Sequence, residues 1–166
     1  MALVVNKCMF ISPLVLVVLV VQVEAILVVT QVGVVVAAIL DDAATGDLVV
    51  FCPDQLAPAG HRLLAGRLTT LSYPMLDDGR RVDWADYAQR NATIDVAAVA
   101  DGILQRADAG SVVWLVWMDG YETFDAQCGE LRLELADRLG RPAKVVRADG
   151  DAFDDAANLS RFPGRP

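Results

Sequence analysis

The first forty residues of the chain are almost uniformly apolar. From Cys8 to Leu40 the only ionisable side chains are those of Cys8 and Glu24, and residues 13–21 are apolar on every face of a helix or a strand. Such a run is suited to lipid, because about 20 consecutive apolar residues are enough to cross a bilayer. We therefore set residues 1–28 apart as a hydrophobic transmembrane or signal segment.

Three interpretations of this segment are open. It has the layout of a signal peptide, with Lys7 before the apolar run and a cleavage site at residues 23–25. It is also long enough for a membrane anchor, or for the last span of a polytopic protein. Valine-rich buried parallel strands are the third interpretation. Both membrane interpretations place Lys7 before the segment and Asp41 and Asp42 after it, which puts the rest of the chain outside the cytoplasm.

Beyond residue 28, apolar positions follow helical spacing in some stretches and strand-like runs in others. The pattern predicts helices over 30–40, 53–65, 82–90, 94–107 and 123–139, and strands over 47–52, 68–73, 111–117 and 143–148. From residue 150 onward it predicts an acidic loop and a Pro/Gly tail. Strands that alternate with helices indicate an α/β fold. We expect a small Rossmann-like three-layer sandwich with a mostly parallel sheet over residues 29–162, and a tail over 163–166.

Two of these elements are the most clearly marked. The strand over 111–117 is apolar on both faces, which is typical of the central strand of a parallel sheet. The helix that follows has Thr123 as its expected N-cap, and Gly140 with Pro142 as its stop. We therefore place the strand in the middle of the sheet, with the helix packed against it.

Charge and motifs exclude several classes of ligand. The net charge is −8, and no run of Lys and Arg is interleaved with aromatic residues, so we expect no nucleic-acid partner. Neither a GxGxxG fingerprint nor a Walker glycine loop is present, and we expect no nucleotide or other cofactor.

Ligands of open parallel sheets bind beyond the carboxyl ends of the strands. The residues that follow the strands over 47–52 and 111–117 are therefore the best candidates for ligand contacts: Asp54, Gln55, Asp119 and Tyr121. The alternative is that Asp54 and Asp119 merely begin helices. We expect four further aromatic residues to belong to the core or to a sheet face: Trp84, Tyr87, Trp114 and Trp117.

The chain has three cysteines without a CxxC pair and a single histidine, so we expect no metal site. Cys52 ends a strand, and Cys128 lies on the buried face of a later helix, so both approach one rim of the sheet. If the domain is extracytoplasmic, the favoured interpretation is a disulfide between them. Two buried free thiols are one alternative, and a Cys52 nucleophile with His61 as its base is another.

Several short motifs occur in a fixed order. They are residues 46–56 (GDLVVFCPDQL), 73–74 (YP), 82–87 (VDWADY), 113–117 (VWLVW), 120–124 (GYETF) with Cys128, and 159–162 (LSRF). Together they resemble the soluble C-terminal domain of actinobacterial multi-span membrane glycosyltransferases, a mannosyltransferase-like family that uses polyprenyl-phosphate sugars. In that family the domain follows the last span outside the membrane, and the catalytic acidic residues lie in an early extracytoplasmic loop between spans. This chain has no such loop, so no catalytic residue is carried over.

The resemblance implies an extracytoplasmic accessory domain of a membrane glycosyltransferase. Its expected partners are the membrane, through the N-terminal segment, and a glycan or lipid-linked sugar acceptor. Two alternatives stay open. One is a secreted or membrane-anchored binding module without enzymatic activity, and the other is a small autonomous hydrolase that uses Asp54, Asp119 or His61.

Overall fold

The structure of the protein is a computed structural model, which describes residues 31–64, 66–149 and 156–165. Its elements are, in chain order, α2 (Gln31–Asp42), β1 (Leu48–Cys52), the 3-10 helix η1 (Asp54–Leu56), α3 (Ala57–Leu64), β2 (Thr69–Ser72), α4 (Tyr87–Asn91), α5 (Val96–Arg106), β3 (Val113–Trp117), α6 (Gln127–Leu139), β4 (Ala143–Val146) and β5 (Asn158–Phe162). The hydrophobic segment over 1–28 lies outside the described residues, so its three interpretations stay predictions. None of the helices that the structure describes is long and apolar enough to cross a membrane.

The five strands form one mixed sheet in the order β2-β1-β3-β5-β4. The prediction that the strand over 111–117 is central is confirmed, because β3 has two strands on each side. β1 pairs in parallel with β2 and with β3, whereas β5 pairs antiparallel with β3 and with β4. Two pairings are thus parallel and two antiparallel, so the α/β class is confirmed but the sheet is mixed rather than mostly parallel.

The antiparallel pairings come from β5, which lies in the stretch that the sequence pattern predicted to be loop and tail. Its residues Leu159 and Phe162 are buried on opposite faces of the sheet. Eleven residues, 147–157, separate β4 from β5, fewer than the dozen or more that a crossover to a parallel neighbour needs. The chain therefore turns back, and β5 takes the place beside β3 while β4 becomes the edge strand.

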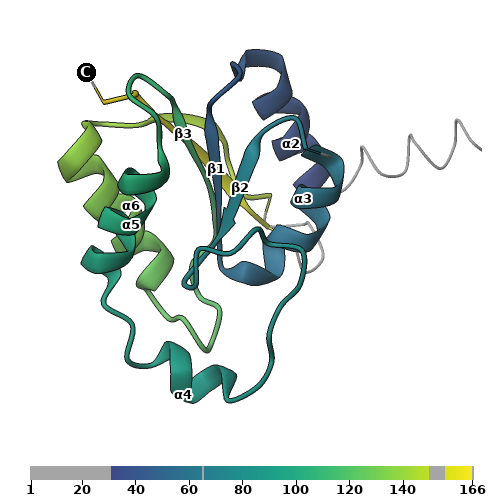
Figure 1. Ribbon diagram of the computed structural model, residues 1–166. Coiled ribbons are helices and arrows are strands. Elements are labelled where there is room, and N and C mark those ends of the chain that lie inside the picture. The colour runs from purple at the N-terminus through teal and green to yellow at the C-terminus, as the bar shows by residue number, and fades with distance from the viewer. Residues whose placement is uncertain (1–30, 65, 150–155, 166) are drawn as a thin grey trace, which may run out of the picture.

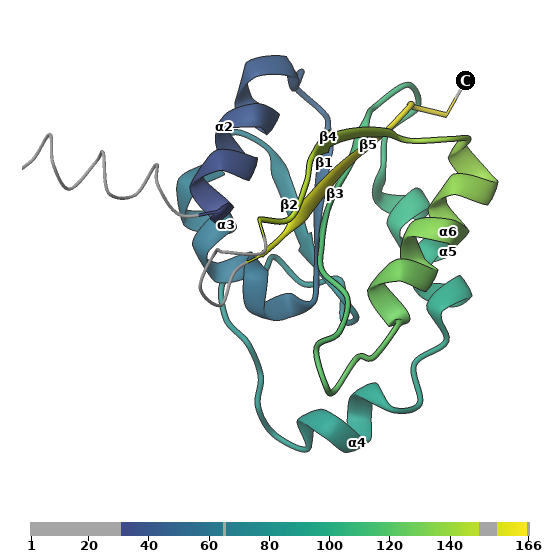
Figure 2. The same cartoon turned by 180° about the vertical axis from the view of Figure 1, so that it is seen from behind.

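Helices cover both faces of the sheet (Figures 1 and 2). Alternate residues of each strand point to opposite faces. In β1, Val50 belongs to the core shared with α5 and α6, and Val49 belongs to the core shared with α2 and α3. All five residues of β1 are buried, as a strand covered on both faces requires. The domain is therefore built of three layers.

Two predicted helices begin later than their apolar spacing indicated. The helix expected over 82–90 is shorter and consists of α4 alone. Asp86 has a left-handed φ of 48°, which stops the helix from extending toward the N-terminus. The helix expected from Thr123 begins at Gln127, because Asp125 is also left-handed, with φ 45°. Its end at Gly140 is confirmed, with φ 92°.

Candidate functional site

The predicted site residues gather at one edge of the sheet. β1, β2 and β3 run in parallel, so residues 53–55, 73–74 and 118–121 leave the sheet at the same edge, which we call the rim. Residues 75–95 connect β2 to α5 and carry α4, and we call this segment the strap. Figures 1 and 2 show the strap passing beyond the carboxyl ends of the strands, with α4 farthest from the sheet.

A disulfide fixes the rim to α6. Cys52, at the end of β1, is bonded to Cys128, in the first turn of α6, and their Cα atoms lie 5.5 Å apart. Both residues are buried, and this is the pairing that the sequence favoured. Cys52 therefore has no free thiol, and the hypothesis of a Cys52 nucleophile with His61 as its base is wrong. The ring Nδ1 of His61 lies instead 2.9 Å from Thr70 Oγ1, whose own proton is donated to the Asp78 carbonyl, so the ring nitrogen is the donor.

Two of the predicted ligand residues, Asp54 and Gln55, bind the strap. Asp54 is buried and accepts a hydrogen bond from the Tyr87 hydroxyl of α4. Gln55 Nε2 donates to the same hydroxyl oxygen at 2.5 Å. Burial raises the pKa of Asp54, and its hydrogen bond from Tyr87 opposes the rise. Burial and the neighbouring Asp54 also raise the pKa of Tyr87. Tyr87 thus stays protonated and donates, while Asp54 takes up a proton more readily than an exposed aspartate.

An aromatic cluster joins the rim, the strap and the loop before α6. The rings of Tyr73, Tyr87 and Tyr121 lie 5.7, 5.5 and 6.1 Å from the ring of Phe124, measured between centroids. Tyr73 and Tyr87 meet Phe124 edge to face, the arrangement that aromatic quadrupoles favour. The three segments therefore share one packed core at this end of the molecule.

A polar network runs beside these rings. The Tyr73 hydroxyl donates to Gln127 Oε1 at 2.7 Å, and Gln127 Nε2 donates to the Asn91 carbonyl at 3.1 Å. Burial and the charge of Glu130 raise the pKa of Tyr73, so this hydroxyl stays a donor. Among the described residues, the fully buried Asn91 amide has no hydrogen-bond partner for either Oδ1 or Nδ2, and the buried Gln55 Oε1 has none. Buried polar atoms are normally paired, so these three atoms are exceptions to the usual pattern.

Trp84 lies outside the core that the sequence pattern predicted for it. Its side chain is 60% exposed, and its ring packs on one side against Tyr87, with 4.9 Å between centroids. The turn before α4 carries it beyond the core. The other three aromatic residues follow the expectation: Tyr87 and Trp114 are buried, and the half-buried Trp117 donates from Nε1 to Ser160 Oγ at 3.0 Å.

The remaining predicted ligand residues, Asp119 and Tyr121, shape the loop that leads into α6. Asp119 is exposed, and its Oδ1 accepts a hydrogen bond from the Gly129 N–H at 2.8 Å, in the first turn of α6. This is the helix-starting role given as the alternative, although Asp119 lies eight residues before the helix. Tyr121 is half-buried, and its carbonyl accepts the N–H groups of Phe124 and Asp125.

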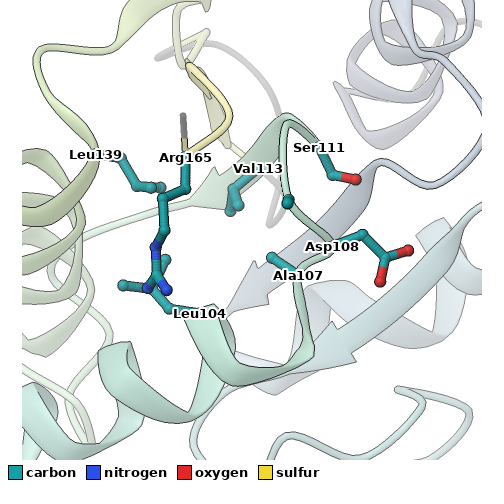
Figure 3. A pocket seen from close by; sticks show the side chains of 8 residues that line it. Leu104, Ala107, Asp108, Ser111, Val113, Leu139 and Arg165 are labelled. Atoms are coloured by element: carbon teal, nitrogen blue, oxygen red, sulfur yellow. The ribbon is translucent and has the colours of Figure 1, made fainter.

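A small hollow of about 90 Å³ lies at the opposite edge of the sheet, between the C-terminal ends of α5 and α6. Figure 3 shows the stem of Arg165 lying among Leu104, Val113 and Leu139, while the carboxylate of Asp108 points away. The hollow contains none of the predicted site residues. We interpret it as a gap in apolar packing that the C-terminal tail covers.

Within the described ranges, no group of His, Cys, Asp and Glu side chains is able to hold a metal ion. Comparison with known proteins gives no match: no family model matches the chain, and no curated protein or solved structure is significantly similar to it.

Proposed function

We propose that this chain is an extracytoplasmic accessory domain of a membrane glycosyltransferase, and that its rim and strap face the acceptor glycan. The observation that carries the proposal is the Cys52–Cys128 disulfide, which is buried and joins β1 to α6. Structural disulfides persist in oxidising compartments and are rare in a reducing cytosol. The order of charges around the hydrophobic segment supports the same side of the membrane.

The motifs that resemble the glycosyltransferase family meet at one place. Cys52, Tyr73, Tyr87, Phe124 and Cys128 come from four of these motifs, and all five residues belong to the same buried cluster at the strap. Residues scattered over 76 positions of the chain thus form one structural unit. The motifs therefore contribute to a common piece of structure.

The test is to express the full chain in bacterial cells with a phosphatase fused to its C-terminus that is active only outside the cytoplasm. Cells are fractionated, the protein is denatured so that buried thiols become accessible, and thiols are alkylated before and after reduction. We expect a membrane-bound protein with an active reporter, whose Cys52 and Cys128 are protected from alkylation until reduction. A Cys128→Ala variant is the matched control, because its Cys52 is open to alkylation without reduction. A soluble protein with both thiols free and an inactive reporter contradicts the proposal.

The native gene separates this proposal from the anchored binding module. We expect the gene to encode further membrane spans upstream of Met1. A reading frame that truly begins at Met1 favours the binding module.

A further inference from the structure

Trp84 is a large aromatic side chain that the fold holds in solvent. Of the five large apolar side chains that are exposed among the described residues, it has the highest exposed fraction, 60%. One side of the indole rests on Tyr87, which itself packs against Phe124 of the core. Because a rigid aromatic ring loses little entropy on binding, an exposed and supported indole is a prepared contact surface.

One guanidinium holds the chain on both sides of Trp84. Arg90 Nη2 donates to the Asp83 carbonyl at 2.6 Å, and Nη1 donates to the Ala85 carbonyl at 3.0 Å. Nη1 also lies 3.0 Å from Asp83 Oδ2, and the Ala85 N–H donates to the other Asp83 oxygen. The hydrogen bond from Ala85 and the charge of Arg90 lower the pKa of Asp83, which keeps this pair ionised. The hydrogen bonds of Arg90 therefore hold the backbone that carries the indole, and the Tyr87 ring supports one side of the indole.

An open hollow lies on the strap immediately after Trp84 in the chain. It is shallow and widely open to solvent, with a volume of about 500 Å³. Its lining offers hydrogen-bond donors and acceptors: Asp86, Gln89, Arg90 and Thr93, together with Ala85.

The charges of the strap and the position of Trp84 relative to the other exposed apolar residues favour some classes of ligand over others. The strap carries five aspartates against three arginines, so a phosphate backbone or an anionic lipid surface is disfavoured. A protein interface needs an apolar centre, but three of the other four exposed apolar residues lie on α2, α6 and β4, and the fourth, Met75, lies at the start of the strap, nine residues before Trp84. A neutral sugar fits both features, because its ring C–H groups pack on an indole and its hydroxyl groups both donate and accept.

We propose that Trp84 and the hollow beside it form a carbohydrate subsite, in which a neutral sugar ring stacks on the exposed face of the indole. The hydroxyl groups of the sugar bond to the polar side chains that line the hollow. This inference rests on the proposed function and deepens it, since it names the surface that meets the acceptor glycan. Arg90 is a positioning residue in this subsite, because it holds the turn that carries the indole.

The experiment uses the full chain in a detergent without a sugar headgroup, titrated with mannotriose, arabinotriose and maltotriose. Binding is followed by tryptophan emission and by magnetisation transfer from the protein to the sugar protons. We expect at least one trisaccharide to bind, and Trp84→Ala to weaken its binding by roughly tenfold or more, as loss of an aromatic stacking contact does. Trp84→Phe keeps an aromatic face and retains most of the affinity.

Leu133→Ala is the matched control, since Leu133 is equally exposed, at 59%, but lies on α6. It is expected to bind as the unaltered chain does. Arg90→Ala is expected to weaken binding and to speed the rotational motion of the indole, measured by fluorescence anisotropy. Circular dichroism confirms that each variant is folded.

Three results overturn the inference: no trisaccharide binds the folded chain at millimolar concentration, Trp84→Ala binds unchanged, or phosphatidylcholine vesicles bind through Trp84 while sugars do not. The thiol experiment keeps the two proposals apart. If the chain is oxidised and membrane-bound but its sugar binding does not change in Trp84→Ala, only the proposed subsite is contradicted. If the chain is reduced and soluble, the proposed accessory function is contradicted, whatever the result of the sugar titration.

Discussion

Reduction of the Cys52–Cys128 disulfide is expected to destabilise the domain strongly. The bond closes a loop between residues 76 positions apart, and loop-closure entropy for that length amounts to about 4.5 kcal/mol at 25 °C. Reduction breaks the bond but removes no buried atom, so the loss of the loop constraint dominates. Domains of this size are stable by only about 5–15 kcal/mol, so reduction removes a large part of the total.

The assay is urea unfolding of the full chain in detergent, followed by tryptophan fluorescence with and without reductant. With a urea dependence of about 2 kcal/mol per molar, the midpoint is expected to fall by roughly 2 M on reduction. The double variant Cys52→Ala/Cys128→Ala is the control, and its urea midpoint is expected to be the same with and without reductant. Cys8 is present in both proteins, so any effect of its own cancels. A shift in midpoint below about 0.5 M, or an equal shift in the double variant, refutes the reasoning.

Substitutions at three further positions, Asp54, Asp47 and Gly60, test the packing around the sheet by unfolding measurements. Folding raises the pKa of Asp54, so its contribution to stability is greatest at acid pH and is lost as the pH rises through the folded pKa. Asp54→Asn keeps an acceptor for Tyr87 and is expected to be at least as stable as the unaltered chain at pH 7. The stability gained by this substitution is expected to shrink at pH values below about 4. A gain in stability that grows in acid contradicts this reasoning. Asp54→Ala strands the Tyr87 hydroxyl and is expected to cost about 1–3 kcal/mol. Asp47→Ala removes the acceptor of two backbone N–H groups and one indole N–H, and we expect a loss of about 3 kcal/mol, with a smaller loss for Asp47→Asn. Gly60→Ala places a methyl group 2.2 Å from the Phe51 ring and is expected to cost about 1–3 kcal/mol; if Phe51→Leu in the same chain restores none of it, the clash is not the cause.

The sequence predicted the elements whose signal is local. β1 and β3 are continuous apolar runs, and such runs are typical of strands covered on both faces, wherever the rest of the chain goes. The buried stripes of α2 and α5 follow from helical spacing in the same way. The two cysteines were also placed correctly, because one ended a predicted strand and the other lay on a predicted inward face.

The candidate site was only partly visible in the sequence. Asp54 and Gln55 were found because they follow a strand, but Asn91 and Gln127 reach the rim from segments that are distant in the chain. Trp84 was assigned to the core or to a sheet face, but the structure exposes it. The aspartates on either side of it were the available signal of a turn, at positions 83 and 86.

Apolar spacing by itself determined the strands β1 to β4 and the buried sides of α2 and α5, because these depend on neighbours within a few residues. The tertiary structure decided where β5 lies, since Leu159 and Phe162 give a weak local pattern and their strand is stabilised by pairing with β3 and β4. It also decided where α6 begins, through the contact of Asp119 with Gly129, and how the strap exposes Trp84. These features depend on contacts between residues distant in sequence, and such contacts exist only once the sheet has brought its carboxyl ends together.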